Sequence, residues 1–293
     1  MNRQTFAITG ITGQVGGVVA RTLLADSRPV RAVVRSAEKG KVWAQQGCEV
    51  VVAEMNDARA LQAAFEGADG VFVLLPPNFA PSKGFPEAGC VVAALHEALE
   101  AVHPGKVVCL STIGAQASQP NLLTQLKIME QGLGRLPMPI VFLRAAWFME
   151  NAAGDVEKAV KAGVIQSFLQ PLDKLFPMVA TADIGRVAAE LLQERAAARK
   201  VIELEGPRRV SPNDLAAAFS KALNRTIRAE AIQRDKWEAL FEAQGMVDPE
   251  PRMRMLDGFN EGWIEFESGE ADSTKGTVSL DTVIRELVNH RPT

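Results

Sequence analysis

Three glycines at regular spacing form the stretch of this 293-residue chain that could bind a phosphate group. The run TFAITGITGQVGG, residues 5–17, places Gly10, Gly13 and Gly16 directly after a short apolar segment. Glycines in such a turn permit a sharp bend, let phosphate approach the backbone and let the next helix pack on the strand. A helix expected over 14–25 would point its positive N-terminus at the phosphates. Because strand, turn and helix occur together, the sequence predicts a pyrophosphate-binding site rather than only a tight turn.

A basic residue after the second expected strand bears on which dinucleotide binds. An acidic side chain at this place binds the ribose 2′-hydroxyl of NAD. This chain has Arg35 instead, followed by Lys39 and Lys41. A guanidinium here can bind the 2′-phosphate of NADP through charge-assisted hydrogen bonds. The alternative is a solvated charge after a strand, and the position favours NADP(H) as the cofactor.

Other candidate cofactor-binding residues stand where later strands are expected to end. In doubly wound sheets, ligands bind at the carboxyl ends of the strands. Asn56 and Asp57 could reach the adenine, and they could also cap the helix that follows. A proline after the fourth strand ends it and shapes a wall beside the ribose or nicotinamide. The residues at these strand ends are Asn56, Asp57, Leu74, Leu75, Pro76 and Ser111.

Several kinds of chemistry lack their usual residues. The chain has no tyrosine, three histidines and three widely spaced cysteines. A tyrosine acid is therefore excluded, and a histidine metal cage or a disulfide framework is disfavoured. No carboxylate or cysteine cluster suggests a metal site.

Composition and patterning narrow the class further. The formal net charge is −3 with no basic run, which argues against a nucleic-acid partner. No apolar stretch reaches the length of a membrane span. The first strand is expected to begin by Thr5, which leaves no room for a signal peptide. We therefore expect a cytoplasmic globular protein.

The elements that must position these residues alternate in the first half of the chain. Short runs rich in Val, Ile and Leu alternate with segments of helical pattern. This rhythm is typical of βαβ units in a parallel, doubly wound sheet. The expected strands are 5–9, 30–34, 49–53, 70–75, 107–110 and 140–143, and the expected helices are 14–25, 37–46, 58–65, 89–101 and 122–132.

After about residue 148 the rhythm changes. Helices are expected over 152–161, 183–195, 235–244 and 282–289, with a further helix start at Ser211. Short strands are expected over 163–168, 200–204 and 226–232. The proline- and charge-rich segment 248–254 is expected to be a loop. The predicted fold is an α/β Rossmann domain with a doubly wound parallel sheet and a smaller mixed α+β lobe. The Rossmann domain spans 1–148, with a contribution from 179–200, and the lobe comprises 149–178 and 201–293.

Several of these stretches resemble the NmrA-like family of atypical short-chain dehydrogenase/reductases. The similarity covers roughly the first 200 residues. The family includes NAD(P)H:quinone oxidoreductases and non-catalytic redox sensors. The stretches that carry the resemblance are ITGITGQVG (8–16), VVRSAEK (33–39), GADGVFVLLPP (67–77), VVCLSTIGA (107–115), KIME (127–130), FLRAAWFMEN (142–151) and VATADIGRVAAELL (179–192).

The resemblance implies an NADP(H)-binding Rossmann domain and a small lobe that closes over a cleft. It assigns Arg35 as the basic residue after the second strand. It also places Lys127, Trp147, Phe148 and Asn151 beside the nicotinamide end of the cofactor. The turn residues that it assigns to the pyrophosphate are Gly10, Thr12, Gly13, Gln14, Val15 and Gly16.

The chain departs from the wider superfamily because its usual Tyr-x-x-x-Lys pair is absent. Proton-relay chemistry on an alcohol or carbonyl is therefore doubtful. Hydride transfer to a quinone needs less help, because the cofactor supplies the reactive carbon and the protein mainly holds the ring. Lys127 is the candidate catalytic residue, placed to stabilise a forming oxyanion. The alternative is a helix lysine paired with Glu130.

Two functions are thus open. The first is an NADP(H)-dependent oxidoreductase that reduces a small apolar acceptor such as a quinone, with enones, imines or azo groups as further candidates. The second is a redox sensor that binds NADP(H) and regulates a partner protein. Aromatic and methionine side chains of the second lobe would suit a flat substrate, although most are expected to be core. They are Trp147, Phe148, Phe168, Phe176, Met178, Trp237, Phe241, Met246, Met253, Met255, Phe259 and Trp263.

Overall fold

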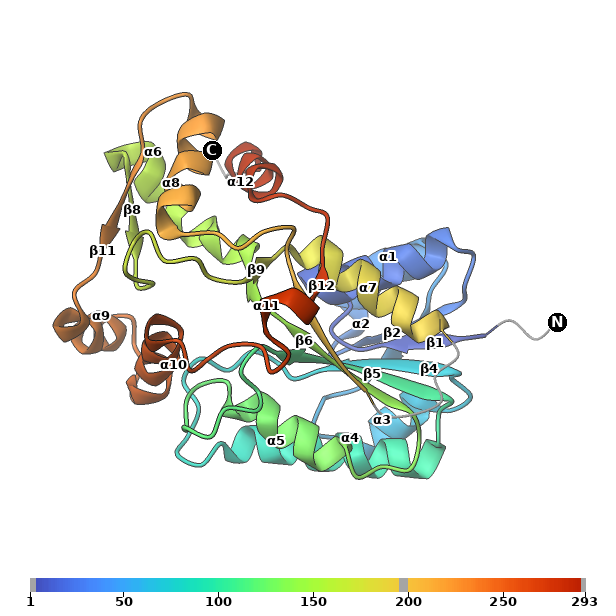
Figure 1. Cartoon of the computed structure of the whole chain (residues 1–293). Coiled ribbons are helices and arrows are strands. Elements are labelled where there is room, and N and C mark those ends of the chain that lie inside the picture. Colours follow the sequence, from blue (N-terminus) through green and yellow to red (C-terminus); the bar gives the residue numbers. More distant parts are fainter. Residues whose placement is uncertain (1–3, 195–199, 291–293) are drawn as a thin grey trace.

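The computed structural model describes residues 4–194 and 200–290. Its main feature is an eight-stranded parallel sheet in the order β12-β10-β6-β5-β4-β1-β2-β3 (Figure 1). The six strands expected in the first half of the chain all belong to it, so the doubly wound α/β prediction is confirmed. They are β1 (Phe6–Ile8), β2 (Val30–Val34), β3 (Glu49–Val52), β4 (Gly70–Leu74), β5 (Lys106–Thr112) and β6 (Ile140–Ala145).

The order of the strands reverses at β1, which lies between β2 and β4. Phe6 is in register with Val30 on one side and with Gly70 on the other. The connection after β1 leads to β2, and the connection after β4 leads to β5 in the opposite direction, which opens a crevice beyond the carboxyl ends of these strands. The glycine turn follows β1 and therefore lies at this crevice.

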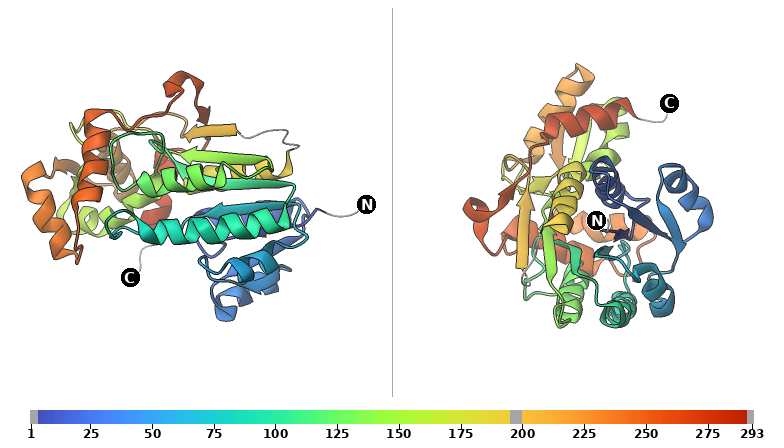
Figure 2. Two further views of the ribbon diagram at one scale, coloured as in Figure 1. Left: turned by 90° about the horizontal axis from the view of Figure 1, so that it is seen from below. Right: turned by 90° about the vertical axis from the view of Figure 1, so that its right-hand side faces the viewer.

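Helices cover both faces of the sheet. In β1, Phe6 and Ile8 join the core on one face and Ala7 joins the core on the other. This alternation is what a strand buried on both faces requires. One face carries α1 (Gln14–Ala25) and α7 (Thr181–Gln193), and the other carries α3 (Ala58–Phe65), α4 (Pro86–Val102) and α5 (Thr124–Leu133) (Figures 1 and 2). The helix α2 (Ala37–Gln45) connects β2 and β3.

Two later strands extend the sheet beside β6. They are β10 (Lys200–Glu205) and β12 (Thr274–Lys275), and both run parallel to their neighbours. We expected residues from 201 onward in the smaller lobe, yet these two segments lie in the main sheet. The division of the chain into lobes stays a prediction. The expected helix over 183–195 ends in the structure at Gln193, and Arg195 lies outside the described residues.

The remaining elements form a smaller layer against one end of the sheet (Figure 1). This layer contains two short pairs of parallel strands, β7 with β9 and β8 with β11. The helix α12 packs on α8 and on η1. Within the described ranges, none of the helices combines the length and apolar character needed to cross a membrane. The elements are β7 (Trp147–Phe148), η1 (Met149–Asp155), α6 (Val156–Ala162), β8 (Val164–Ser167), β9 (Met178–Val179), α8 (Pro212–Leu223), β11 (Arg228–Ala231), η2 (Arg234–Lys236), α9 (Trp237–Ala243), α10 (Glu250–Glu261), α11 (Gly269–Asp272) and α12 (Leu280–Asn289).

The loop expected over 248–254 is wrong, because α10 begins inside it at Glu250. Pro249 occupies the N-cap position and Pro251 lies in the first turn. Proline is compatible with a first turn, since the N–H that it lacks would have no partner within the helix. The two prolines therefore mark the start of a helix.

Candidate functional site

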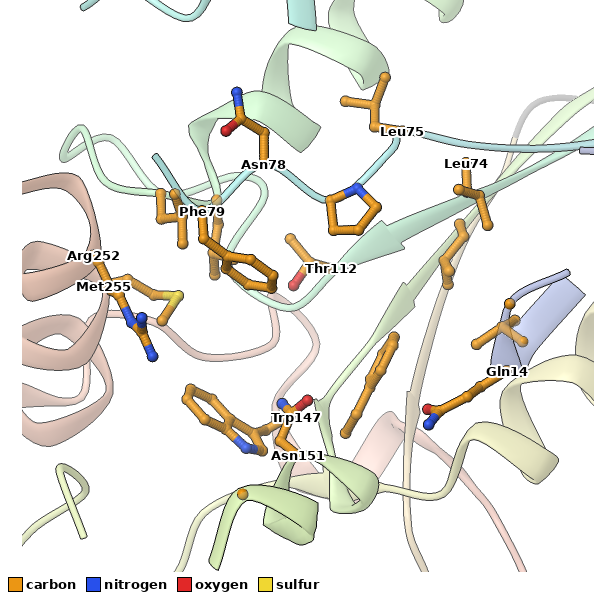
Figure 3. Close-up of a pocket in the computed structure, with 18 of the residues that line it drawn as sticks. Gln14, Leu74, Leu75, Asn78, Phe79, Thr112, Trp147, Asn151, Arg252 and Met255 are labelled. Atoms are coloured by element: carbon orange, nitrogen blue, oxygen red, sulfur yellow. The ribbon is translucent and has the colours of Figure 1, made fainter. Parts of the chain in front are cut away.

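A cavity of about 1030 Å³ lies beyond the carboxyl ends of the sheet strands, between the sheet and the smaller layer (Figure 3). The glycine turn forms one end, where Gln14 is seen, and α10 forms the other, where Arg252 and Met255 are seen. Ligand cavities commonly measure about 300–1,000 Å³. This one is thus large enough for an extended ligand together with a second molecule.

The three glycines of the turn have distinct geometries. Gly10 has a φ of +61°, which is the left-handed conformation that favours glycine. A Cβ on Gly16 would lie less than 3.0 Å from the carbonyl oxygen of Gly10, so α1 packs there without room for a side chain. At Gly13 a Cβ would meet only that same oxygen, at 3.3 Å. The sharp bend and the tight helix packing predicted for the first and third glycines are confirmed.

The structure brings most of the predicted cofactor-binding residues together. They line one continuous cavity although they come from five separate segments of the chain. Their roles in binding stay predictions. The predicted residues that line the cavity are Gly10, Thr12, Gly13, Gln14, Val15, Gly16, Arg35, Leu74, Leu75, Pro76, Ser111, Trp147, Phe148 and Asn151.

The two residues predicted to reach the adenine, Asn56 and Asp57, lie outside the cavity lining. Asp57 is the N-cap of α3, and its carboxylate accepts a hydrogen bond of 3.0 Å from the backbone N–H of Ala60. The helix-cap interpretation of Asp57 is therefore confirmed. Met55, rather than Asn56, lines this part of the cavity. Contact of Asn56 or Asp57 with an adenine stays a prediction.

Lys127 also lies outside the cavity lining. Its amino group donates a hydrogen bond of 2.8 Å to the carbonyl oxygen of Ala117. The expected partner Glu130 instead pairs with Arg144 at 2.8 Å and accepts a 2.6 Å hydrogen bond from the Ser111 hydroxyl. The alternative of a Lys127–Glu130 pair is therefore wrong, because Arg144 on β6 holds that carboxylate. A catalytic role for Lys127 stays a prediction.

Positive charge gathers at the glycine-turn end of the cavity. Arg35 and Lys39 both line it. Lys41, the third basic residue of the segment, pairs with Glu38 at 2.5 Å on the exposed face of α2. The first turn of α1 carries no acidic residue that would offset the positive helix terminus. This end of the cavity therefore suits a multiply charged anion.

The opposite end is walled by aromatic and methionine side chains. The Trp147 and Phe259 rings meet edge to face, with centroids 5.3 Å apart. Phe176, Trp237 and Phe241, in contrast, are fully buried in the core. About half of the apolar side chains considered above thus line the cavity, namely Trp147, Phe148, Phe168, Met178, Met255 and Phe259. Such a wall suits a flat apolar ring.

The sequence reasoning considered Met255 and Phe259 but missed Arg252 and Leu256 on the same helix, α10. Arg252, Met255, Leu256 and Phe259 all line the cavity. Their spacing of three, four and seven residues is that of one helix face. This periodicity is present in the sequence, but the two prolines before it suggested a loop.

Asp155 is a further residue that the sequence reasoning missed. It lines the cavity, and burial raises its pKa to about 6 against the lowering effect of the nearby Lys158 charge. A carboxyl of this kind can hold and release a proton close to neutral pH. No sequence signal marked it, because a single Asp before a helix is an ordinary capping pattern.

None of the three cysteines lines the cavity. Cys48 and Cys109 are buried, and burial raises the pKa of both thiols. Both are therefore poor nucleophiles. Among the residues that the structure describes, no three His, Cys, Asp or Glu side chains are grouped to hold a metal ion.

Comparison with known proteins gives consistent matches. The model of the NmrA-like family matches residues 2–256. The NAD(P)H azoreductase of Xenophilus azovorans is 27% identical over 261 residues, which cover 87% of this chain and 84% of that protein. Quinone oxidoreductase 2 of Escherichia coli is 25% identical over 244 residues, covering 83% and 82%. The structure of Citrobacter sp. triphenylmethane reductase with NADP(H) matches with a TM-score of 0.79 and 20% identity, covering 97% of this chain and 99% of that one. At that identity the likeness concerns the fold.

Proposed function

The chain belongs to the NmrA-like family, and we propose that it is an NADP(H)-dependent reductase that transfers hydride to a quinone or a similar conjugated acceptor. One observation carries this proposal. A single cavity joins the glycine turn and Arg35 to the aromatic wall around Trp147 and Phe259. The similarity to a quinone oxidoreductase and to an azoreductase supports the same class of acceptor.

The residues at the glycine-turn end fit the cofactor. Gly13 lines the cavity without a side chain, and Gly16 lets the N-terminus of α1 pack close to the turn. The pyrophosphate would lie on the N–H groups of this terminus. Arg35, with Lys39 beside it, would hold the 2′-phosphate of the adenosine ribose. When bound, NADPH supplies the hydride.

The side chains at the other end would hold the acceptor ring in place. Trp147, Phe148 and Phe259 offer flat apolar surface, and a positioned ring needs little further catalysis when it is itself electrophilic. Lys127 would have to release the Ala117 carbonyl before it could stabilise an oxyanion. We therefore assign the larger effect to positioning, and the protons can come from water.

The proposed function is tested by a cofactor titration followed by an acceptor screen. NADPH is expected to bind, and its absorbance at the reduced band is expected to fall when quinones or azo compounds are added. Tight NADPH binding without turnover of any acceptor would contradict the reductase proposal.

That same outcome would favour the second candidate, a sensor that binds NADP(H) and regulates a partner protein. The absence of tyrosine, and with it of the usual proton-relay pair, is the feature that favours this candidate. A sensor is expected to change its affinity for a partner when NADPH replaces NADP⁺. A pull-down that gives the same partners in both cofactor states would count against it.

The preference for NADP(H) has its own test in Arg35→Ala. We expect this variant to lose NADPH affinity by about tenfold or more while NADH affinity changes little, because only NADPH carries the 2′-phosphate. Lys41→Ala is the matched control, since Lys41 pairs with Glu38 away from the cavity. Equal losses for both cofactors would refute the assignment.

A further inference from the structure

Arg252 is a cavity-lining arginine at the end away from the glycine turn. It lies in the first turn of α10, and its side chain extends into the space between Phe79 and Trp147, opposite Gln14 (Figure 3). Its guanidinium carbon lies 4.4 Å from the centroid of the Phe241 ring. Among the described residues, the structure gives Arg252 no ion pair and no hydrogen bond to a protein group.

The neighbouring Arg254 shows what a structural arginine on this helix does. Arg254 donates to the side-chain oxygen of Gln119 and pairs with Asp257 at 3.6 Å. It also stacks on Trp263, with 5.4 Å from the guanidinium carbon to the ring centroid. The side chain of Arg254 thus binds other parts of the protein. The hydrogen-bond donors of Arg252, in contrast, have no acceptor among the described residues and are available to a ligand.

The other charges of the cavity leave Arg252 uncompensated. Arg35 and Lys39 lie at the glycine-turn end, where the cofactor phosphates are proposed. Lys158 lies beside Asp155 and donates to the side chain of Gln166. Burial lowers the pKa of Arg252, and no carboxylate opposes that effect. Within the part of the chain that the structure describes, no protein group balances the charge of Arg252 at the acceptor end.

A half-buried guanidinium of this kind favours a particular ligand chemistry. Arginine stays protonated in proteins, so its desolvation must be offset by a partner. The guanidinium lies over the Phe241 ring, and among the described residues its N–H donors have no protein acceptor. A planar fork of donors matches a carboxylate or sulfonate, which it can bind through two parallel hydrogen bonds.

We propose that Arg252 selects acceptors that carry an anionic substituent, a carboxylate or a sulfonate, at the end remote from the atom that receives the hydride. The aromatic wall would hold the conjugated ring, and Arg252 would hold the anionic group at the end of the cavity formed by α10. Selection of this kind rests on the proposed reductase function for its role, while the anion site itself is measurable without turnover.

The first experiment measures binding to the NADP⁺-loaded protein, in which no hydride can be transferred. Naphthalene-2-sulfonate and its neutral analogue naphthalene-2-sulfonamide are titrated by calorimetry. We expect the sulfonate to bind about tenfold more tightly or better. Arg252→Met should abolish this preference and Arg252→Lys should retain part of it. Arg254→Met is the matched control and should keep the preference, and NADP⁺ affinity should be unchanged in the Arg252 variants.

The second experiment measures turnover with 1,4-naphthoquinone and 1,4-naphthoquinone-6-sulfonate. The ratio of kcat/KM values is expected to favour the sulfonate in the wild type and to fall by about tenfold in Arg252→Met. Circular dichroism and Tm establish that each variant is folded.

The outcomes separate the two proposals. Equal binding of the two naphthalenes, or a preference that survives in Arg252→Met, would overturn anion selection even if both quinones are reduced. If neither quinone is reduced but the sulfonate preference depends on Arg252, the anion site stands and the reductase proposal with these acceptors fails.

Discussion

At the scale of single residues, Gly16 has the strictest requirement in the glycine turn. Its missing side chain is what allows the first turn of α1 to lie against the carbonyl oxygen of Gly10. That contact fixes where the N–H groups of the helix start point, and these groups are the proposed ligands of the pyrophosphate. A side chain added at residue 16 would collide with backbone atoms of Gly10 and Ile11, which cannot move aside as a flexible side chain can.

Gly16→Ala is therefore expected to damage both stability and cofactor binding. The added Cβ overpacks the turn, which should lower the free energy of unfolding by about 1–3 kcal/mol, and NADPH affinity should fall by tenfold or more, about 1.4 kcal/mol. Urea unfolding and an NADPH titration measure the two effects. Gly89→Ala in α4 is the matched control, because nothing lies within 4 Å of its built Cβ. An unchanged NADPH affinity in folded Gly16→Ala would contradict the role of the turn.

Some residues of the site can be identified from a local sequence pattern. Others can be identified only when the direction of the side chain in the folded protein is known. The glycine turn and Arg35 belong to a motif whose geometry is set within one βα unit. Lys127 illustrates the second kind, because its helix was identified while its amino group is held by Ala117, on the loop after β5. Arg252 and Asp155 reach the cavity only through tertiary packing. The helix periodicity around Arg252 is visible in the sequence, but no spacing along the chain shows that Arg252 and Asp155 line the same cavity as Trp147.

At the scale of elements, the contact between α1 and α7 depends on one small residue. A Cβ on Gly185 of α7 would lie less than 3.0 Å from the Cβ of Val18 and at 3.0 Å from the backbone oxygen of Val15. Since Val15 also lines the cavity, the separation of the two helices affects the position of the cofactor end. Close packing here thus connects helix spacing to binding.

Gly185→Ala is expected to push α7 away from α1. Overpacking should cost about 1–3 kcal/mol of the free energy of unfolding, with a smaller loss of NADPH affinity through Val15. Thermal unfolding with and without NADPH measures both. Glu190→Ala on the exposed side of α7 is the control, where we expect a change within about 0.5 kcal/mol. If Gly185→Ala is as stable as the wild type, the helices must be able to move apart freely.

Helices and strands with a strong apolar periodicity could be predicted from the sequence. Elements that form only by pairing with another strand could not. The runs that became β2 and α1 match their expected bounds because apolar periodicity sets them directly. β12 has two residues and exists only because it pairs with β10. The start of α10 was missed because Pro251 is compatible with two local structures. For β12 the deciding interaction thus comes from a distant part of the chain.

At the scale of the whole molecule, Asp183 links the sheet domain to the segment that leads into α12. Its buried carboxylate accepts hydrogen bonds of 2.8 Å from the backbone N–H groups of Thr277 and Val278. The chain then continues into α12, which packs on α8 and η1 of the smaller layer. The cavity lies between these two parts, so this carboxylate helps to set its shape.

Asp183→Asn tests that link, and pH provides an independent check. Burial alone would raise the pKa of Asp183, but hydrogen bonds from Val278, Arg186 and Thr277 hold it below its ordinary value. A carboxyl with a lowered pKa stabilises the fold above its unfolded pKa of about 4, and that contribution is lost as the pH falls through the folded value. An amide cannot satisfy all of these donors, so we expect a loss of about 2–3 kcal/mol at pH 7.

The difference in stability between wild type and Asp183→Asn should therefore narrow as the pH falls below about 4, because the wild-type carboxyl then becomes protonated. Calorimetric unfolding at several pH values from 7 down to 3 measures it. Asp281→Asn is the matched control, since its pair with Lys221 is exposed and should contribute less than about 1 kcal/mol. A difference that stays constant with pH would mean that the charge of Asp183 does not hold the two parts of the molecule together.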